Sequence, residues 1–319
     1  MKKNKFLLIG LLSLTALATG CEQSQKPVEE EFSTTALSVK VASPSKAPAV
    51  ALFAHLKEEN VEINSAANNV VAYLTNASDK DMVIVPTNAG ISAIVSKNAQ
   101  FKIAATVTFG NFYLIQTGKD SDKTLNEGDK VLAFQEKNVA GKLFSYLYGD
   151  KNLETTYLAD VTAVKNEILT NESSDYDYVL LAQPDVNEIL KSKKDYSVYA
   201  NVQEDFKTKS GGKEITQASI FVKNTSDKEA VTTALNTIKS DVDALLKNTK
   251  SLLEATKDVE DQVFSSKLGS TKEELKGLLD NENQLGIGFK KAIDNKASID
   301  AFISTFGMGA TSEEIYFNY

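Results

Sequence analysis

The chain has 319 residues, a formal charge of −8 at neutral pH, one cysteine and one histidine. All 35 lysine-plus-arginine residues are lysines, and tryptophan is absent. The acidic balance argues against nucleic acid as a partner, the single thiol excludes an internal disulfide, and the missing guanidinium excludes a bidentate clamp on a carboxylate, sulfonate or phosphate.

The first 20 residues predict a secretory signal. Three lysines within residues 2–5 precede an apolar run from Phe6 to Leu17, and small residues fill positions 18–20. This order is typical of a signal peptide, and the run is too short to span a bilayer. Small residues directly before Cys21 resemble the lipobox of bacterial lipoproteins, which implies that Cys21 is acylated and becomes the new N-terminus. An ordinary signal peptide with a coincidental cysteine is the alternative.

Residues 21–36 predict a disordered tether. The segment is rich in Glu, Gln and Ser and includes three consecutive glutamates at 29–31, a composition that buries too little apolar surface to fold. Two or more acyl chains hold a protein stably on a membrane. We therefore expect a monomer anchored by lipid to the outer face of the cell membrane.

Strands and helices alternate from residue 37 to residue 115, which predicts a first lobe built from parallel βαβ units. The strand patterns are 37–42, 61–64, 81–86 and 101–107, and the helical patterns are 49–59, 68–74 and a segment that starts after Thr87. Residues 112–116 form a further strand that leads out of this lobe.

Residues 116–210 predict a second lobe, and residues 211–319 return to the first. The second lobe has strand patterns at 130–134, 176–181 and 196–202 and helical patterns at 140–148, 161–169 and 185–190; residues 207–213 read as a loop. After a strand at 215–222, the last third is expected to be helical and to cover the first lobe. Its apolar residues recur at helical spacing: Val231, Leu235, Ile238, Val242, Leu245 and Leu246.

Several short motifs in order are similar to the solute-binding lipoproteins of ABC importers. They are 41–48 (VASPSKAP), 84–90 (IVPTNAG), 110–115 (GNFYLI), 179–184 (VLLAQP), 286–292 (GIGFKKA) and 299–302 (IDAF). The branch that they resemble includes sulfonate, nitrate and thiamine-pyrimidine binders. Two departures leave the ligand class open. Gln183 stands where many relatives carry an acidic residue, and residues 134–136 lack the glycines that are common in the first loop of the second lobe.

The resemblance implies a type 2 periplasmic-binding-protein-like α/β fold, with two lobes joined by a hinge and the ligand in a cleft between them. It implies delivery of a small solute to an ABC permease with a cytoplasmic ATPase, without catalysis, cofactor or metal. The missing arginine favours a planar, neutral or weakly charged solute such as a pyrimidine, a vitamin precursor or a flavin. The alternatives are a surface interaction or sensor lipoprotein without transport, and an enzyme resembling thiamine-pyrimidine synthases, whose cysteine-rich iron segment is absent here.

Open parallel sheets bind ligands at the carboxyl ends of their strands, which singles out two turns in the first lobe. Ser43, Ser45 and Lys46 precede a predicted helix and are expected either to contact the ligand or to cap that helix. Thr87 and Asn88 follow the next buried strand, with the same two interpretations.

The crossing between the lobes contributes three candidates. Phe109 is expected either to stack on a planar ligand or to pack in the core. Gly110 suits a backbone that needs conformational latitude or a close approach, and Asn111 follows it.

The second lobe adds Gln135, Asn138 and Gln183, which lie between a strand and a helix. Amides both donate and accept hydrogen bonds, which suits a neutral heterocycle. Asp185 is expected to act as the N-cap of its helix. The single histidine, His55, has no cysteine or second histidine to complete a metal site, and we expect it at the surface or at a boundary.

Overall fold

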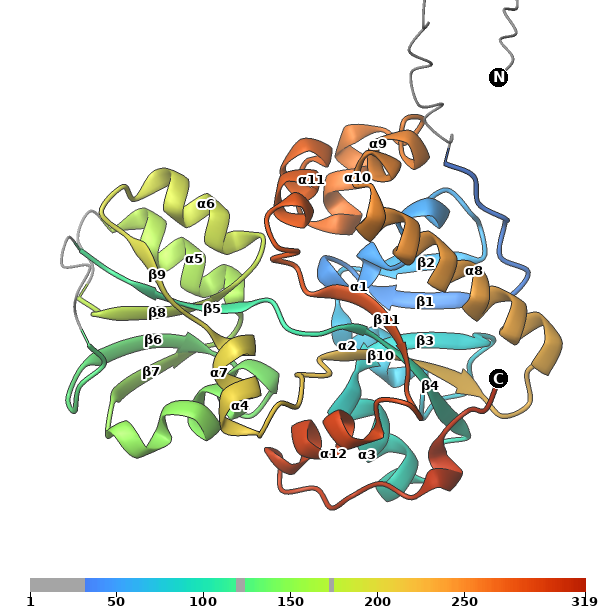
Figure 1. Ribbon diagram of the computed structural model, residues 1–319, viewed down its shortest axis with the longest axis horizontal. Coiled ribbons are helices and arrows are strands. Elements are labelled where there is room, and N and C mark those ends of the chain that lie inside the picture. The colour runs from blue at the N-terminus through green and yellow to red at the C-terminus, as the bar shows by residue number, and fades with distance from the viewer. Residues whose placement is uncertain (1–31, 119–123, 172–174) are drawn as a thin grey trace, which may run out of the picture. The chain divides into compact units, whose positions relative to one another are not determined.

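Two β-sheets organise the part of the chain that the computed structural model describes, residues 32–118, 124–171 and 175–319. Sheet A has the strand order β11-β4-β10-β3-β1-β2, and sheet B has the order β7-β6-β8-β5-β9 (Figure 1). Residues 32–319 form one compact unit. The predicted signal peptide, Cys21 and the tether up to residue 31 lie outside the described residues.

Sheet A is mixed, whereas the sequence predicts parallel units. Strands β1 (Val41–Pro44), β2 (Val61–Asn64) and β3 (Met82–Pro86) are parallel. Strand β10 (Ala218–Lys223) lies antiparallel between β3 and β4 (Phe101–Thr108), and β11 (Ile287–Lys291) pairs antiparallel with β4. Strand β10 runs in the opposite direction because the chain re-enters this sheet from the second lobe.

Sheet B forms the second lobe. Its parallel strands are β6 (Lys130–Phe134), β7 (Glu154–Leu158) and β8 (Tyr178–Ala182). Strand β5 (Phe112–Gln116), which the sequence places at the exit of the first lobe, pairs antiparallel with β8 and with β9 (Ser197–Asn201) in this sheet. The chain therefore crosses between the sheets twice, from β4 to β5 and again ahead of β10.

Helices accompany both sheets, and none within the described ranges is long and apolar enough to cross a bilayer. The second lobe contains α4 (Val139–Tyr148), η2 (Gly149–Lys151), α5 (Val161–Thr170), α6 (Asp185–Ser192) and α7 (Val202–Lys209). The first lobe contains α1 (Ala47–Val50), η1 (Phe53–His55), α2 (Ala67–Ala72), α3 (Thr87–Lys97), α8 (Lys228–Lys247), α9 (Lys250–Ala255), α10 (Asp261–Leu268), α11 (Lys272–Asp280), α12 (Lys296–Ser304) and η3 (Glu313–Ile315).

The local assignments differ from the sequence patterns in a few places. The helix expected over 49–59 is two short pieces, α1 and η1. Strand β7 and helix α7 were not predicted, and α7 covers the start of the expected loop at 207–213. Strand β11 interrupts the C-terminal third, because the 286–292 motif lies along the edge of sheet A.

Helix α8 covers sheet A as its apolar spacing predicts. Asp227 caps its start by accepting a hydrogen bond from the Ala230 amide. The buried side chains share one hydrophobic cluster with strands β1 and β10, whereas Leu246 is 40% exposed. These buried residues are Val231, Leu235, Ile238, Val242 and Leu245.

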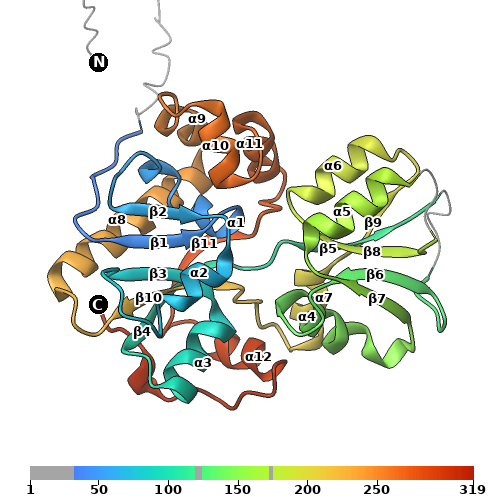
Figure 2. The ribbon, with the colours of Figure 1, turned by 180° about the vertical axis from the view of Figure 1, so that it is seen from behind.

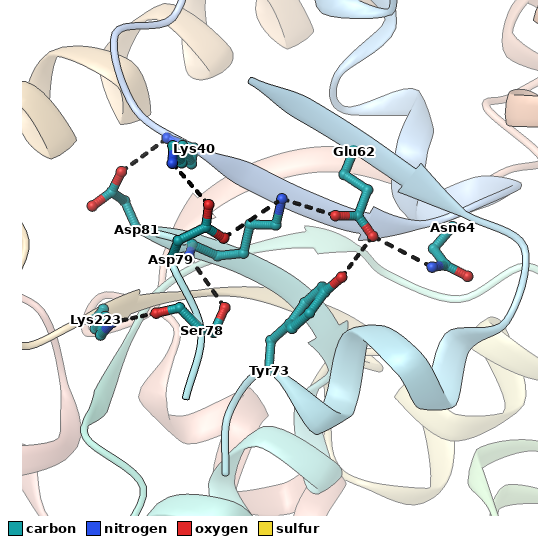
Figure 3. Close-up of polar contacts among 9 residues, drawn as sticks. Lys40, Glu62, Asn64, Tyr73, Ser78, Asp79, Asp81 and Lys223 are labelled. Carbon is teal, nitrogen blue, oxygen red and sulfur yellow. Dashed lines mark hydrogen bonds and ion pairs between the residues drawn. The ribbon is translucent and has the colours of Figure 1, made fainter. Parts of the chain in front are cut away.

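Polar contacts fasten the loop before β3 to the edge of sheet A (Figure 3). The Lys40 amide donates to Asp81, and Lys40 Nζ lies 2.7 Å from Asp79. Glu62 on the edge strand β2 accepts from Lys80 and from the Tyr73 hydroxyl, both at 2.8 Å. Ion pairs near the surface each contribute about 1 kcal/mol or less to stability, so the cluster mainly fixes local geometry.

Candidate functional site

The carboxyl ends of the parallel strands in both sheets face the junction between the lobes. Strands β1 and β3 lead into α1 and α3, and β6 and β8 lead into α4 and α6. Figure 2 shows α1 and α2 on the side of sheet A that lies nearest to α4 and α5. A direct contact joins the two sides, since Lys46 Nζ lies 3.2 Å from the carboxylate of Asp185.

Asp185 is a buried ion partner and not the N-cap that the sequence predicts. Pro184 occupies the N-cap position of α6 without a capping bond, and Asp185 is the first helical residue. Its carboxylate lies 2.9 Å from Lys165 and 3.2 Å from Lys46. Burial opposes the charge of Lys165, but hydrogen bonds to Glu188 and Asp185 raise its pKa overall. Asp185 therefore keeps a cationic partner even if Lys46 moves away.

Gln183 joins three parts of the structure. Its Nε2 donates to Gln284 at 2.9 Å, and its Oε1 accepts from the Asn187 amide at 3.2 Å. Its backbone amide donates to the Asn111 carbonyl, and Asn111 Nδ2 donates back to the Gln183 carbonyl at 2.8 Å. These bonds use one of the two Nε2 hydrogens and one of the two Oε1 lone pairs, so the Gln183 side chain keeps one donor and one acceptor position for a solute.

Backbone contacts hold the turn after β1. The Ser43 hydroxyl is buried and donates to the Pro44 carbonyl, the Ser45 amide donates to Asn64, and the Lys46 amide donates to Lys267. Helix α1 is a single turn without a side-chain cap, so capping does not explain the two serines. Of the three predicted residues, Lys46 is the one whose side chain reaches the second lobe.

Helix α3 begins at Thr87, so Thr87 and Asn88 do not cap it; Pro86 holds the N-cap position without a capping bond. The capping interpretation is therefore wrong for both residues. The Thr87 hydroxyl lies 2.7 Å from Ser219 Oγ. Asn88 Oδ1 is buried and has no partner in the described part of the chain.

The crossing strand makes a close backbone contact with the segment before β11. The Phe109 amide donates to the Gly286 carbonyl at 2.7 Å. Gly110 has a φ of 107°, and a Cβ atom on Gly286 would lie 2.1 Å from the Gly110 carbonyl oxygen. Glycine at both positions permits this approach.

A cavity of about 400 Å³ lies beside the crossing. Phe109, Gly110 and Tyr113 line it together with residues of α7, α8 and the β11 edge. The Phe109 side chain is mostly buried, and Lys290 Nζ lies 5.3 Å from its ring centre and 2.6 Å from Glu214. The protein's own lysine therefore covers the aromatic ring.

The second-lobe candidates lie at strand-to-helix turns. Gln135 is half-buried with a φ of 53°, and its backbone carbonyl accepts from the Asn138 amide. Asn138 is exposed at the N-cap position of α4 but makes no capping bond.

His55 is buried, which corrects the expectation of a surface residue. Its side chain is fully covered, with Nδ1 2.7 Å from Glu58 and Nε2 2.8 Å from Asp241 on α8. Burial lowers its pKa, but the hydrogen bonds to Asp241 and Glu58 raise the pKa above its usual value overall. The helical pattern of residues 49–59 gave no sign of α8, which lies nearly two hundred residues further along the chain.

Comparison with known proteins identifies the fold. Neither a protein-family model nor a curated protein sequence matches the chain. An ABC transporter protein from Parabacteroides distasonis superposes with a TM-score of 0.63 at 15% sequence identity, and the superposition covers 84% of this chain and 91% of that protein. The ligand-binding component of an ABC-type import system from Staphylococcus aureus, solved with zinc bound, gives a TM-score of 0.63 at 8% identity, covering 89% of this chain and 97% of that protein. The periplasmic aliphatic sulphonate binding protein of Escherichia coli gives a TM-score of 0.57 at 14% identity, covering 85% of this chain and 88% of that protein.

The chain has the periplasmic binding protein fold. This confirms the predicted fold class and the resemblance to solute-binding proteins of ABC importers. Identities of 8–15% show the fold and not the solute. Within the described residues, no group of three His, Cys, Asp or Glu side chains is placed to hold a metal ion.

Sequence reasoning missed two residues at this junction: Gln284, which crosses between the lobes, and Lys165, which pairs with Asp185 within the second lobe. Gln284, the partner of Gln183, lies 101 residues further along the chain. Lys165 lies within α5 and shows no pattern that separates it from other surface lysines. Neither pairing has a local signal, because each depends on how separate elements pack against one another.

Proposed function

We propose that the chain captures a small solute outside the cytoplasm and delivers it to an ABC importer permease, without making or breaking a bond. The observation that carries this proposal is the junction between the sheets. Strand-to-helix turns from both sheets meet there, with Lys46 reaching Asp185 across it, in a fold shared with binding components of ABC importers. Such junctions bind ligands at helix starts and strand ends.

The predicted site residues stay proposals for this junction. Those of the first lobe are Ser43, Ser45, Lys46, Thr87 and Asn88, those of the crossing are Phe109, Gly110 and Asn111, and those of the second lobe are Gln135, Asn138 and Gln183. The absence of arginine supports a planar, neutral or weakly charged solute over an anion that needs a guanidinium clamp.

A thermal-shift screen of the soluble chain starting at Glu22 tests solute capture. A solute that binds only the folded state raises the melting temperature by mass action. The panel contains heterocycles, vitamins and alkanesulfonates, and we expect at least one compound to raise the melting temperature in a concentration-dependent way. Unchanged melting across the panel contradicts the proposal.

We also propose that Cys21 carries the lipid anchor and places the protein on the outer face of the cell membrane. In the variant Cys21→Ala we expect uncleaved precursor and no acylated mature chain, because the thiol is the atom that is modified. Mass spectrometry of the membrane fraction measures this. An acylated, cleaved Cys21→Ala chain would exclude the anchor.

A surface interaction or sensor lipoprotein is the second candidate function. The protein's own groups already join the lobes through the Lys46–Asp185 and Gln183–Gln284 pairs, as expected of a binding fold without cargo. An enzyme resembling thiamine-pyrimidine synthases is less well supported, because the single histidine is buried between Glu58 and Asp241.

A further inference from the structure

Buried oxygens without partners gather where the chain crosses between the sheets. Among the described residues, seven buried side-chain polar atoms have no hydrogen-bond partner in the protein, and five of them belong to this junction. We call these five the acceptor cluster: Asn88 Oδ1, Thr108 Oγ1, Asn111 Oδ1, Thr216 Oγ1 and Gln217 Oε1.

Backbone contacts place the residues of the acceptor cluster at one end of sheet A. The Gln217 amide donates to the Thr108 carbonyl at 2.8 Å, and the Gln217 carbonyl accepts from the Thr87 amide, next to Asn88, at 3.1 Å. Ala218 pairs with both Pro86 and Thr108 in the sheet. Asn111 lies three residues beyond Thr108 and is tied to Gln183 of the second lobe.

Other buried hydroxyls of sheet A do have hydrogen-bond partners within the protein. In the same sheet, Ser219 Oγ lies 2.7 Å from Thr87 Oγ1 and 3.1 Å from Thr106 Oγ1. Leaving a buried oxygen unpaired costs about 1–3 kcal/mol. Several such atoms at one junction point to a partner from outside the chain, and because the atoms are buried in this structure, that partner reaches them only when the lobes separate.

The chemistry of these atoms defines that partner. Amide oxygens only accept hydrogen bonds, whereas hydroxyls accept and donate. Asn111 is held in its orientation because its Nδ2 donates to Gln183, which leaves its Oδ1 as the free group. An oxyanion such as a sulfonate or nitrate also only accepts, and it gains nothing from amide oxygens. The cluster contains no carboxylate, so it lacks the negative charge that a divalent cation prefers.

We propose that the acceptor cluster binds a neutral solute that presents several N–H or O–H donors, such as a heterocycle with ring N–H groups. This inference rests on the proposed function, because it assigns the solute class of the same junction. It separates this chain from a sulfonate-binding protein, which the Escherichia coli neighbour is.

Matched compounds and isosteric variants test the inference. Uracil and xanthine carry ring N–H donors, and 1,3-dimethyluracil and caffeine are their N-methylated counterparts; methanesulfonate and nitrate are the oxyanion probes. We expect calorimetric titration of the soluble chain to show binding of uracil or xanthine, at least about tenfold weaker binding of the methylated form, and no binding of the oxyanions.

The variants Thr108→Val and Thr216→Val remove the unpaired hydroxyls while keeping side-chain shape. We expect each to weaken solute binding about tenfold and to leave the melting temperature of the free protein unchanged or raised, because no protein bond is lost. Thr106→Val is the matched control; it removes a bonded hydroxyl, so it should lower the melting temperature and leave affinity unchanged.

The outcomes are distinguishable. Binding of methanesulfonate or nitrate without binding of uracil or xanthine overturns the donor inference and leaves solute capture standing. Wild-type affinity in both valine variants also overturns it, since the oxygens would then serve only internal water. No binding by any probe counts against solute capture together with the inference.

Discussion

At the scale of single residues, the buried imidazole of His55 couples stability to pH. Its ring contacts the carboxylates of Glu58 and Asp241. These carboxylates also hold the segment before β1, because Asp241 accepts a hydrogen bond from the Thr34 hydroxyl and Glu58 accepts one from the Leu37 amide. The protonated ring donates to both carboxylates. Losing its proton removes one of these bonds and leaves buried negative charge.

This arrangement predicts a pH dependence with a defined sign. The pKa of His55 is raised above 6.5 in the folded chain, so its contribution to stability is fully present below about 6.5 and is lost as the pH rises through the folded-state pKa. We expect the stability advantage of wild type over His55→Gln to shrink between about pH 6 and pH 9. Urea unfolding at several pH values measures it, and a constant difference contradicts the prediction.

Gly286 illustrates a residue whose identity is set by a backbone contact. Its φ is 61°, and an added Cβ would meet the Gly110 carbonyl at 2.1 Å. We expect Gly286→Ala to lower the free energy of unfolding by about 2–4 kcal/mol through strain and overpacking. Gly277→Ala in α11 is the control, because nothing lies within 4 Å of its Cβ, and it should stabilise by up to about 1 kcal/mol. Equal changes in the free energy of unfolding for the two substitutions would show that the contact with the Gly110 carbonyl does not restrict the residue at position 286.

At the scale of elements, α8 carries the packing of the C-terminal third onto sheet A. Ile238 is fully buried in the cluster that includes β1 and β10. We expect Ile238→Ala to cost about 2–5 kcal/mol of unfolding free energy, whereas Leu246→Ala on the same helix, where the side chain is 40% exposed, should cost about 1 kcal/mol or less. Chemical denaturation followed by circular dichroism compares them. Similar losses would mean that α8 does not pack through the predicted face.

At the scale of the whole molecule, contacts between the lobes set how readily they separate. The side-chain pairs among them include Lys46–Asp185, Gln183–Gln284 and Lys191–Glu274, and the Tyr113 hydroxyl donates to the Gln284 carbonyl. A hydrogen bond with Lys191 and another with Ser270 lower the pKa of Glu274 to about 2, but this pair is half exposed and contributes little. The buried Asp185 and Gln183 pairs are therefore the ones expected to matter.

We expect Gln284→Ala combined with Asp185→Asn to lengthen and broaden the distance between the lobes. The chain from Glu22 has no cysteine, so spin labels on Lys97→Cys and Thr162→Cys, which are exposed on α3 and α5, report that distance by pulsed electron resonance. Lys239→Ala, which breaks an exposed ion pair within α8, is the control and should leave the distance between the labels unchanged. A wild-type distribution in the double variant would show that other contacts hold the lobes.

The sequence alone determined the elements that depend on local pattern. Alternating and helical apolar spacing predicted most strands, α4, α5 and the buried face of α8, because burial of one face repeats every two or every 3.6 residues. The order of short motifs predicted the two-lobe fold, which the structural neighbours confirm. The predicted ligand residues stay predictions, with their positions now defined.

Only the tertiary structure decided the pairings between distant segments. It inserts β10 antiparallel between β3 and β4, moves β5 into sheet B, and buries His55 against Asp241, 186 residues away. It also gives Asp185 two lysines in place of a helix cap. The physical reason is that a side chain's partners follow from how segments meet in space, and that meeting leaves no periodic trace in the sequence on either side.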